Sequence, residues 1–202
     1  IVATYNSDGQ PNAAPMGVSI IDEQHLTIKP FNSSTTLTNL KSSLSATVNL
    51  TSNIELFYKT AFKKENQDEI PKEWFEDAKT INTPQLQLAD AVIGVSVEKI
   101  SQLDSERSIV LCKVEFIEAK AKLPKGYCRA FAATIEAIIH ATRIKAFSDQ
   151  ENKQENINKL VELINNCKEI INRTAPNSKY SKILEDIETK IESWGKKNAS
   201  IH

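Results

Sequence analysis

The stretch "LTIKPFNSSTTLTNL", residues 26–40, joins a strand-like run to a helical pattern. The run stops at Pro30, and hydroxyl side chains follow at Ser33, Ser34, Thr35 and Thr36 before Leu37 and Leu40 recur at helical spacing. The first N–H groups of a helix lack internal partners and carry partial positive charge, so this loop could hold an anion, with Lys29 as a nearby cation. A simple N-cap at Ser34 or Thr35 fits equally well.

Composition favours a globular protein with no charged partner surface. The 202 residues include 26 acidic and 25 basic side chains, and 40% are hydrophobic. This balance argues against nucleic-acid and membrane partners. Three cysteines without paired spacing fit a reducing cytoplasm, and Cys112 and Cys167 share faces with apolar residues, which predicts core positions. The chain begins at Ile1 within a strand-like run, so we expect the natural N-terminus to lie upstream.

Short strands dominate the first part of the chain. Residues 1–5, 14–21 and 25–29 predict a meander of three strands joined by turns, and residues 36–43 predict a short helix. Further strands are expected at 46–51, 91–103 and 108–119, whereas residues 54–62 could form a strand or a helix. Residues 63–72 read as a charged, solvated loop, and the longer segment 63–84 could cover a site. About six mostly antiparallel strands predict a small closed barrel over residues 1–122.

The remainder, residues 123–202, is predicted to be helical. Residues 127–147 are apolar on more than one face, which indicates a buried helix lying against the barrel or in a dimer interface. Residues 150–173 and 181–194 each carry one apolar stripe, and the short link between them predicts an antiparallel hairpin. The expected fold class is therefore α+β: a split antiparallel barrel followed by a helical extension.

Several motifs resemble those of the FMN-binding split-barrel superfamily, which includes pyridoxamine-phosphate-oxidase-like and flavin-reductase-like proteins. "SDGQPNAAPMGV" (7–18) resembles the first hairpin, "KPFNSSTTLTNL" (29–40) the phosphate loop, and "ATVNL" (46–50) the strand that follows. Two further motifs follow, "LADAVIGVSVEKI" (88–100) and "CRAFAATIEAIIHATRI" (128–144). The order of all these motifs is similar to that in a mostly archaeal family of unknown function, which adds C-terminal helices to this barrel.

The resemblance implies an FMN site. Its phosphate loop covers Lys29, Pro30, Phe31, Ser33, Ser34, Thr35 and Thr36, with Asn39 near the phosphate or ribityl chain. The resemblance also implies that Met16, Gly17 and Val18 run along the isoalloxazine and that Asn49 lies near the ring. Core packing remains an equal alternative for Met16 and Val18, as does a backbone-bonded barrel position for Asn49. Family members often carry Arg where this chain has Lys29, which lacks the bidentate guanidinium fork.

His140 and Arg143 lie three residues apart and so share a helix face. They could reach the flavin or a substrate at a dimer interface, or they could satisfy buried carbonyls or a carboxylate such as Glu136. No metal-ligand spacing and no nucleophile–base arrangement appears, so no catalytic residue is assigned.

Three functions are weighed. The first, which the resemblance implies, is an FMN-dependent oxidoreductase or flavin-reductase-like homodimer that uses NAD(P)H or a small redox substrate. The alternatives are a non-catalytic binder of FMN or another phosphorylated ligand, and an interaction module built on the same barrel.

Overall fold

The computed structural model describes residues 1–63, 70–120, 128–148 and 150–199. The chain divides into two compact units, Ile1–Leu123 and Pro124–His202. No helix among the described residues is long and apolar enough to cross a membrane.

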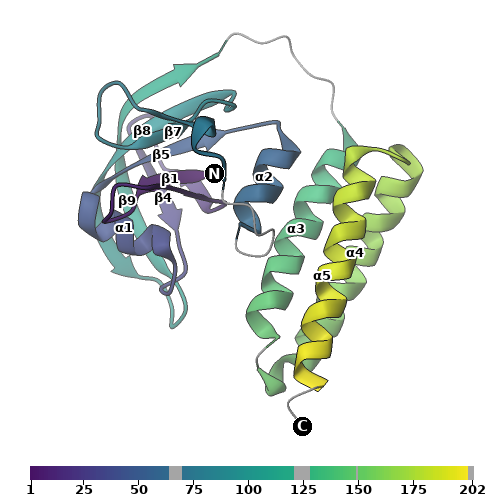
Figure 1. The fold of residues 1–202 in the computed structure, drawn as a ribbon. Helices are drawn as coiled ribbons and strands as arrows, with labels where there is room; N and C mark the ends of the chain where they lie inside the picture. Colours follow the sequence, from purple (N-terminus) through teal and green to yellow (C-terminus); the bar gives the residue numbers. More distant parts are fainter. Residues whose placement is uncertain (64–69, 121–127, 149, 200–202) are drawn as a thin grey trace. The chain divides into compact units, whose positions relative to one another are not determined.

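The first unit is built on a seven-stranded antiparallel sheet with the order β2-β1-β5-β8-β9-β4-β3 (Figure 1). These strands are β1 (Val2–Tyr5), β2 (Pro11–Ala14), β3 (Gly17–Ile20), β4 (His25–Lys29), β5 (Ser45–Leu50), β8 (Ala91–Gln102) and β9 (Ser108–Ala119). A separate hairpin pairs β6 (Phe75–Asp77) with β7 (Pro84–Leu86), and the helices are α1 (Thr35–Ser43), α2 (Ile54–Ala61) and the 3-10 turn η1 (Lys72–Trp74).

The strand expected at residues 14–21 is in fact two strands at opposite edges of the sheet. β2 pairs with β1, and β3 pairs with β4, so the predicted three-strand meander is wrong. The chain passes from β2 to β3 through only Pro15 and Met16, and Pro15 has no N–H to donate to a ladder. Three Cα–Cα steps reach at most about 11 Å, so the two edges must approach each other and the sheet must curl. The predicted split-barrel fold is confirmed.

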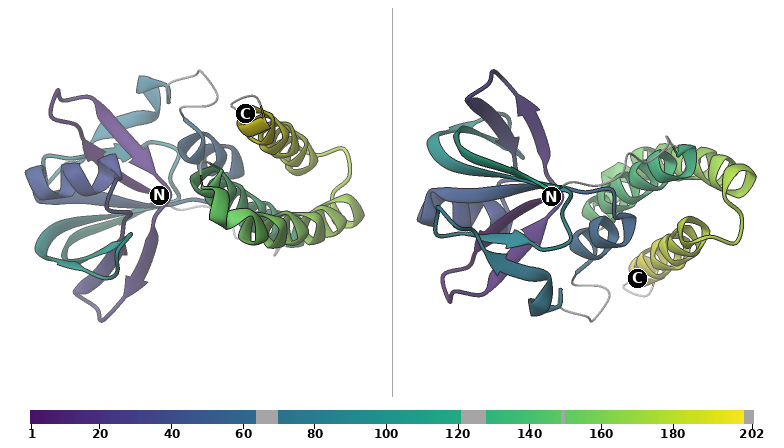
Figure 2. Two further views of the ribbon diagram at one scale, coloured as in Figure 1. Left: turned by 90° about the horizontal axis from the view of Figure 1, so that it is seen from below. Right: turned by 90° about the horizontal axis from the view of Figure 1, so that it is seen from above.

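Each face of the sheet has its own hydrophobic cluster. The inner cluster joins Leu37 and Leu40 of α1 to strand residues such as Ile28, Val48 and Val110. The other cluster joins Leu56 of α2 and Leu86 of β7 to Ala3, Ala13 and Val92. The two helices therefore lie on opposite sides of the sheet, as both views in Figure 2 show.

The segment between β5 and β8 was the least predictable. Residues 54–62, left open between strand and helix, form α2 with Asn53 as its N-cap. The β6–β7 hairpin was not anticipated. Trp74 and Phe75 pack against the cluster beneath α2. The charged loop predicted at residues 63–72 falls largely on residues 64–69, which lie outside the described residues.

The second unit contains α3 (Arg129–Phe147), a 3-10 turn η2 (Glu151–Lys153), α4 (Gln154–Thr174) and α5 (Lys179–Ala199). Each long helix contacts the other two, and the predicted apolar stripes are buried, including Ile164 and Cys167 on α4 and Leu184 and Ile187 on α5. α3 buries Ala133, Ala137, Ile138, Ala141 and Ile144. The expected contact of α3 with the barrel or with a second chain stays a prediction.

Candidate functional site

Ser34 is the N-cap of α1. Its Oγ accepts a hydrogen bond from the Leu37 N–H at 3.2 Å and donates to the Phe31 carbonyl at 2.7 Å. The capping interpretation is therefore correct for Ser34, whereas Ser33 and Thr35 are exposed beside it. A dipolar helix start with free hydroxyls next to it is suited to an anion.

Two of the predicted phosphate residues point inward instead. Asn39 Nδ2 donates to Thr4 Oγ1 and to Asn6 Oδ1, both at 2.9 Å. Thr36 Oγ1 accepts from Asn12 Nδ2 at 3.4 Å, and Thr36 is only 1% exposed. This buried network ties α1 to β1 and β2, so these two side chains position the helix rather than face solvent.

A hollow of about 550 Å³ opens beside the start of α1. Thr35 contributes to its wall, together with Asn6, Asp8 and Asn12 from the β1–β2 hairpin and the cations Lys63 and Lys72. Lys63 Nζ donates to Asn12 Oδ1 and, at 3.2 Å, to the Ala13 carbonyl. Among the described residues that line it, two cations stand against one carboxylate, a balance that favours an anionic ligand. The sequence interpretation assigned no role to Asn12, Lys63 or Lys72. The quoted hairpin motif contains Asn12, and the charged loop contains the two lysines.

The other predicted loop residues lie along the β3–β4 pair. Gly17 is directly opposite Lys29, and a Cβ at Gly17 would stand 3.9 Å from Lys29 Cβ. Gly17 is exposed and Lys29 half-buried, whereas Met16 and Val18 pack against the inner cluster, as the core alternative predicted.

Pro30 and Phe31 continue the chain from this pair. The Pro30 carbonyl accepts from the Ser108 N–H at 3.0 Å, and Pro30 is buried. Phe31 forms a bridge with Arg107 and is 49% exposed. These contacts fix the loop that leads into α1.

Asn49 is a buried structural residue. Its Oδ1 accepts from the Leu86 N–H at 2.8 Å, and its Nδ2 donates to Thr47 Oγ1 at 3.0 Å. Asn49 is 1% exposed, so its side chain joins β5 to the β6–β7 hairpin. The backbone-bonded alternative describes what the structure shows, and a flavin contact stays a prediction.

His140 and Arg143 belong to α3 in the second unit. His140 Nδ1 is buried and has no hydrogen-bond partner among the described residues. Burial lowers the pKa of His140, Glu136 opposes this shift, and Arg143 adds to it. The proposed satisfaction of buried carbonyls is therefore not seen for this nitrogen, and the role of the pair at a flavin site stays a prediction.

The described residues contain no group of three or more His, Cys, Asp or Glu side chains placed to hold a metal ion. Burial, with a smaller contribution from Glu98, raises the pKa of the Cys112 thiol to about 12. Cys112 therefore remains a protonated core residue rather than a nucleophile.

The curled sheet, the capped helix at its centre and the helical unit define an α+β split-barrel protein with a C-terminal helical extension. The chain belongs to the family described as protein of unknown function (DUF447). Residues 1–137 match the N-terminal domain of this family, and residues 128–189 match its second model. The family resemblance inferred from the motifs is confirmed. No curated protein sequence matches the chain.

Solved structures share the fold at low sequence identity. An FMN-bound DUF447 protein from Methanosarcina mazei is 21% identical, with a TM-score of 0.75 over 94% of this chain and 92% of that one. The 2-nitrobenzoate 2-nitroreductase of Pseudomonas fluorescens is 20% identical, with a TM-score of 0.51 over 59% and 63% of the two chains. An FMN-binding protein from Thermus thermophilus, solved with 1-cyclohex-2-enone, is 10% identical, with a TM-score of 0.52 over 58% and 67%.

Proposed function

We propose that this chain binds FMN non-covalently and works as a flavin-dependent oxidoreductase or flavin-reductase-like protein. One observation carries the proposal: the hydroxyl-lined start of α1 opens into a hollow with two lysines. Support comes from the shared fold of the Methanosarcina mazei protein, which was crystallised with FMN. Among the sequence candidates near the start of α1 and on the β3–β4 pair, Ser33, Thr35, Gly17 and Phe31 are exposed and Lys29 is half-buried.

The donor set fits a phosphate. Thr35 offers a hydroxyl at the helix start, and Lys63 and Lys72 offer positive charge across the hollow from Asp8. Lys63 also holds Asn12 and the Ala13 carbonyl, so it shapes the wall while facing the ligand. Both lysines attract a phosphate, and Asp8 repels it. With two cations and one carboxylate, attraction exceeds repulsion, so the lysines favour the bound state.

FMN, when bound, supplies hydride or electron transfer, and the protein supplies binding and orientation. This division of labour explains why the sequence needs no general acid or base. We further propose a homodimer that accepts electrons from NAD(P)H or a small redox substrate. The exposed edge strand β3, with Ile20 at 77% exposure, supports the dimer.

Flavin titration tests the proposal, followed by visible absorbance and by the change in melting temperature. The purified chain is expected to retain FMN and to bind it at least about tenfold more tightly than riboflavin, which lacks the phosphate. Thr35→Val and Lys63→Met should reduce this preference. Thr38→Val is the matched control, because Thr38 is exposed on the same helix but does not line the hollow.

Equal affinity for riboflavin and FMN would overturn the phosphate site, and no flavin binding would overturn the flavoprotein assignment. Stopped-flow oxidation of NADH and NADPH by the holoprotein then separates an enzyme from a binder. Flavin reduction by neither donor would favour a non-catalytic FMN-binding protein.

A further inference from the structure

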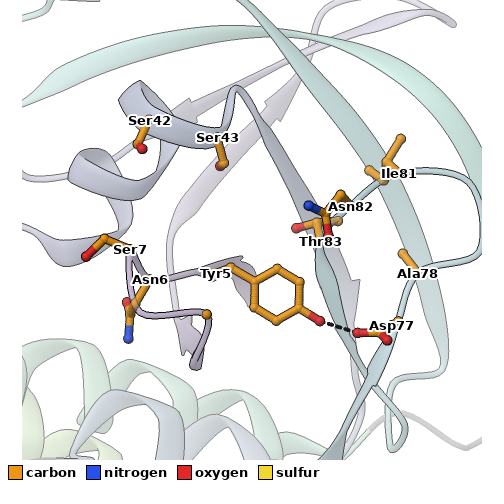
Figure 3. Close-up of a pocket in the computed structure, with 11 residues that line it drawn as sticks. Tyr5, Asn6, Ser7, Ser42, Ser43, Asp77, Ala78, Ile81, Asn82 and Thr83 are labelled. Atoms are coloured by element: carbon orange, nitrogen blue, oxygen red, sulfur yellow. Dashed lines mark hydrogen bonds between the residues drawn. The ribbon is translucent and has the colours of Figure 1, made fainter.

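A second hollow in the first unit encloses about 600 Å³, and Figure 3 shows the residues that line it. Its walls come from three separate segments: the end of β1 with the turn that follows, the last turn of α1, and the β6–β7 hairpin. Asn6 lines both hollows, but the other lining residues take no part in the proposed flavin site. The β6–β7 hairpin, which the sequence did not predict, supplies most of one wall.

One wall of this hollow presents an aromatic ring paired with a carboxylate. The Tyr5 hydroxyl donates to Asp77 Oδ1, so the ring bridges β1 and β6 (Figure 3). Burial, and then the hydrogen bond and negative charge of Asp77, raise the pKa of Tyr5 to about 12. The phenol therefore stays protonated at neutral pH and remains a donor, while the carboxylate keeps lone pairs for a second donor.

Hydroxyls make up much of the remaining polar wall, together with the side-chain amides of Asn6 and Asn82. Ser42 is exposed at the end of α1, and Ser43 Oγ donates to the Asn39 carbonyl at 2.9 Å, which leaves its oxygen able to accept. Thr83 is only 1% exposed, and its Oγ1 has no hydrogen-bond partner among the described residues. Buried hydroxyls are normally paired, so this wall carries hydrogen-bonding capacity that the chain itself does not use.

The charge of the residues that line the hollow indicates whether its ligand is anionic or neutral. Asp77 is the one acidic side chain among the described residues that line it, and no Lys, Arg or His joins it there. Phosphates and carboxylates are therefore disfavoured. A sugar hydroxyl can donate to the carboxylate and accept from a neighbouring hydroxyl, and the face of the Tyr5 ring can pack against sugar C–H groups. We propose that this hollow binds a neutral polyhydroxyl ligand through the vicinal diol of a sugar, free or within a nucleoside.

Amide chemical shifts of the full chain test this site, with D-ribose, adenosine and methylammonium chloride as separate probes. Ribose and adenosine are expected to shift the amides of residues 5–9, 42–43 and 77–83. Tighter binding of adenosine would identify a nucleoside as the source of the diol, and equal binding would identify a free sugar. Tyr5→Phe should weaken binding about tenfold through loss of the phenol. Tyr180→Phe, a tyrosine of α5, is the matched control.

Ser42→Ala provides a second variant that should not disturb folding, because Ser42 is exposed and has no hydrogen bond to lose among the contacts described. A several-fold weaker affinity for ribose supports the site, and an unchanged affinity counts against it. The proposal is overturned if neither diol shifts these amides, or if methylammonium shifts them more strongly than the diols do. FMN retention by Tyr5→Phe separates this outcome from failure of the flavin site.

Discussion

The hydroxyl side chains at the start of α1 differ in what they contact. A hydroxyl cluster before a helix predicts a capped start, and Ser34 provides it. Residue type alone does not tell which hydroxyls face solvent, because that depends on the strand beneath the helix. Thr36 and Asn39 turn toward Thr4, Asn6 and Asn12, whereas Thr35 remains exposed. The contacts made in the folded protein therefore decide which candidates for the phosphate site face solvent and which are buried.

Asn49→Ala is expected to destabilise the first unit without weakening FMN binding by the folded protein. The substitution leaves the buried Leu86 N–H without its acceptor, which should cost about 1–3 kcal/mol of unfolding free energy. Urea denaturation measures the loss, and flavin titration well below the unfolding transition measures affinity. Normal stability with much weaker FMN binding would instead assign Asn49 a direct ligand contact.

At the scale of elements, the long strands β8 and β9 were predicted almost to the residue because their alternation is long and regular. The three-residue strands β6 and β7 have no such pattern, and they exist because Asn49 and the cluster beneath α2 hold them. Pro15 marks the point where the strand expected at residues 14–21 is interrupted. The placement of β2 and β3 at opposite sheet edges depends on long-range pairing that local sequence does not encode.

The start of α1 allows capping and anion binding to be separated. Ser34→Ala removes the N-cap and should cost about 1 kcal/mol of stability. Ser34→Asp should restore most of that loss, because aspartate caps well and its charge suits the helix N-terminus. The same charge should repel the phosphate, so FMN affinity is expected to fall further in Ser34→Asp than in Ser34→Ala. Thermal melts and flavin titrations of both variants give the two readouts, and equal FMN affinity in both would place the phosphate elsewhere.

The buried nitrogen of His140 makes α3 sensitive to acid. Burial lowers the folded-state pKa of His140, so the unfolded chain binds the proton more tightly than the folded chain does. Stability should therefore rise with pH across this window, and it should fall as pH drops below about 6.5, the ordinary histidine value. Melting temperatures across a pH series are expected to show a smaller fall for His140→Leu than for the wild type. His25→Gln is the matched control, since His25 lies in the first unit.

The pH prediction fails if the wild type and His140→Leu lose stability in parallel on acidification. If His140→Leu also lowers FMN affinity at neutral pH, where its effect on folding is smallest, the sequence-based assignment of His140 to the flavin site gains support.

At the scale of the whole molecule, the compact units meet at Leu123 and Pro124, whereas the matches to the two family models overlap at residues 128–137. Only the first half of α3, residues 129–137, is therefore shared by both matches. The division into a barrel at 1–122 and a helical extension at 123–202 stays a prediction, since the N-terminal match continues past that boundary. The overlap favours keeping the two parts together in any functional experiment.

The edge strand β3 connects the proposed flavin site to assembly. Ile20 and Ile21 are 77% and 56% exposed at this edge, and exposed apolar edge strands tend to pair with another chain. Light scattering after size exclusion is expected to show a dimer for the wild type and a shift toward monomer for Ile20→Lys. Leu163→Lys, at a 43% exposed position on α4, should leave the dimer intact. Gly17, a candidate for the flavin site, and Ile20, the proposed dimer contact, both belong to β3. If the flavin site lies between subunits, the monomeric Ile20→Lys variant should therefore lose FMN as well. A monomer that keeps full FMN affinity would confine the flavin site to one chain.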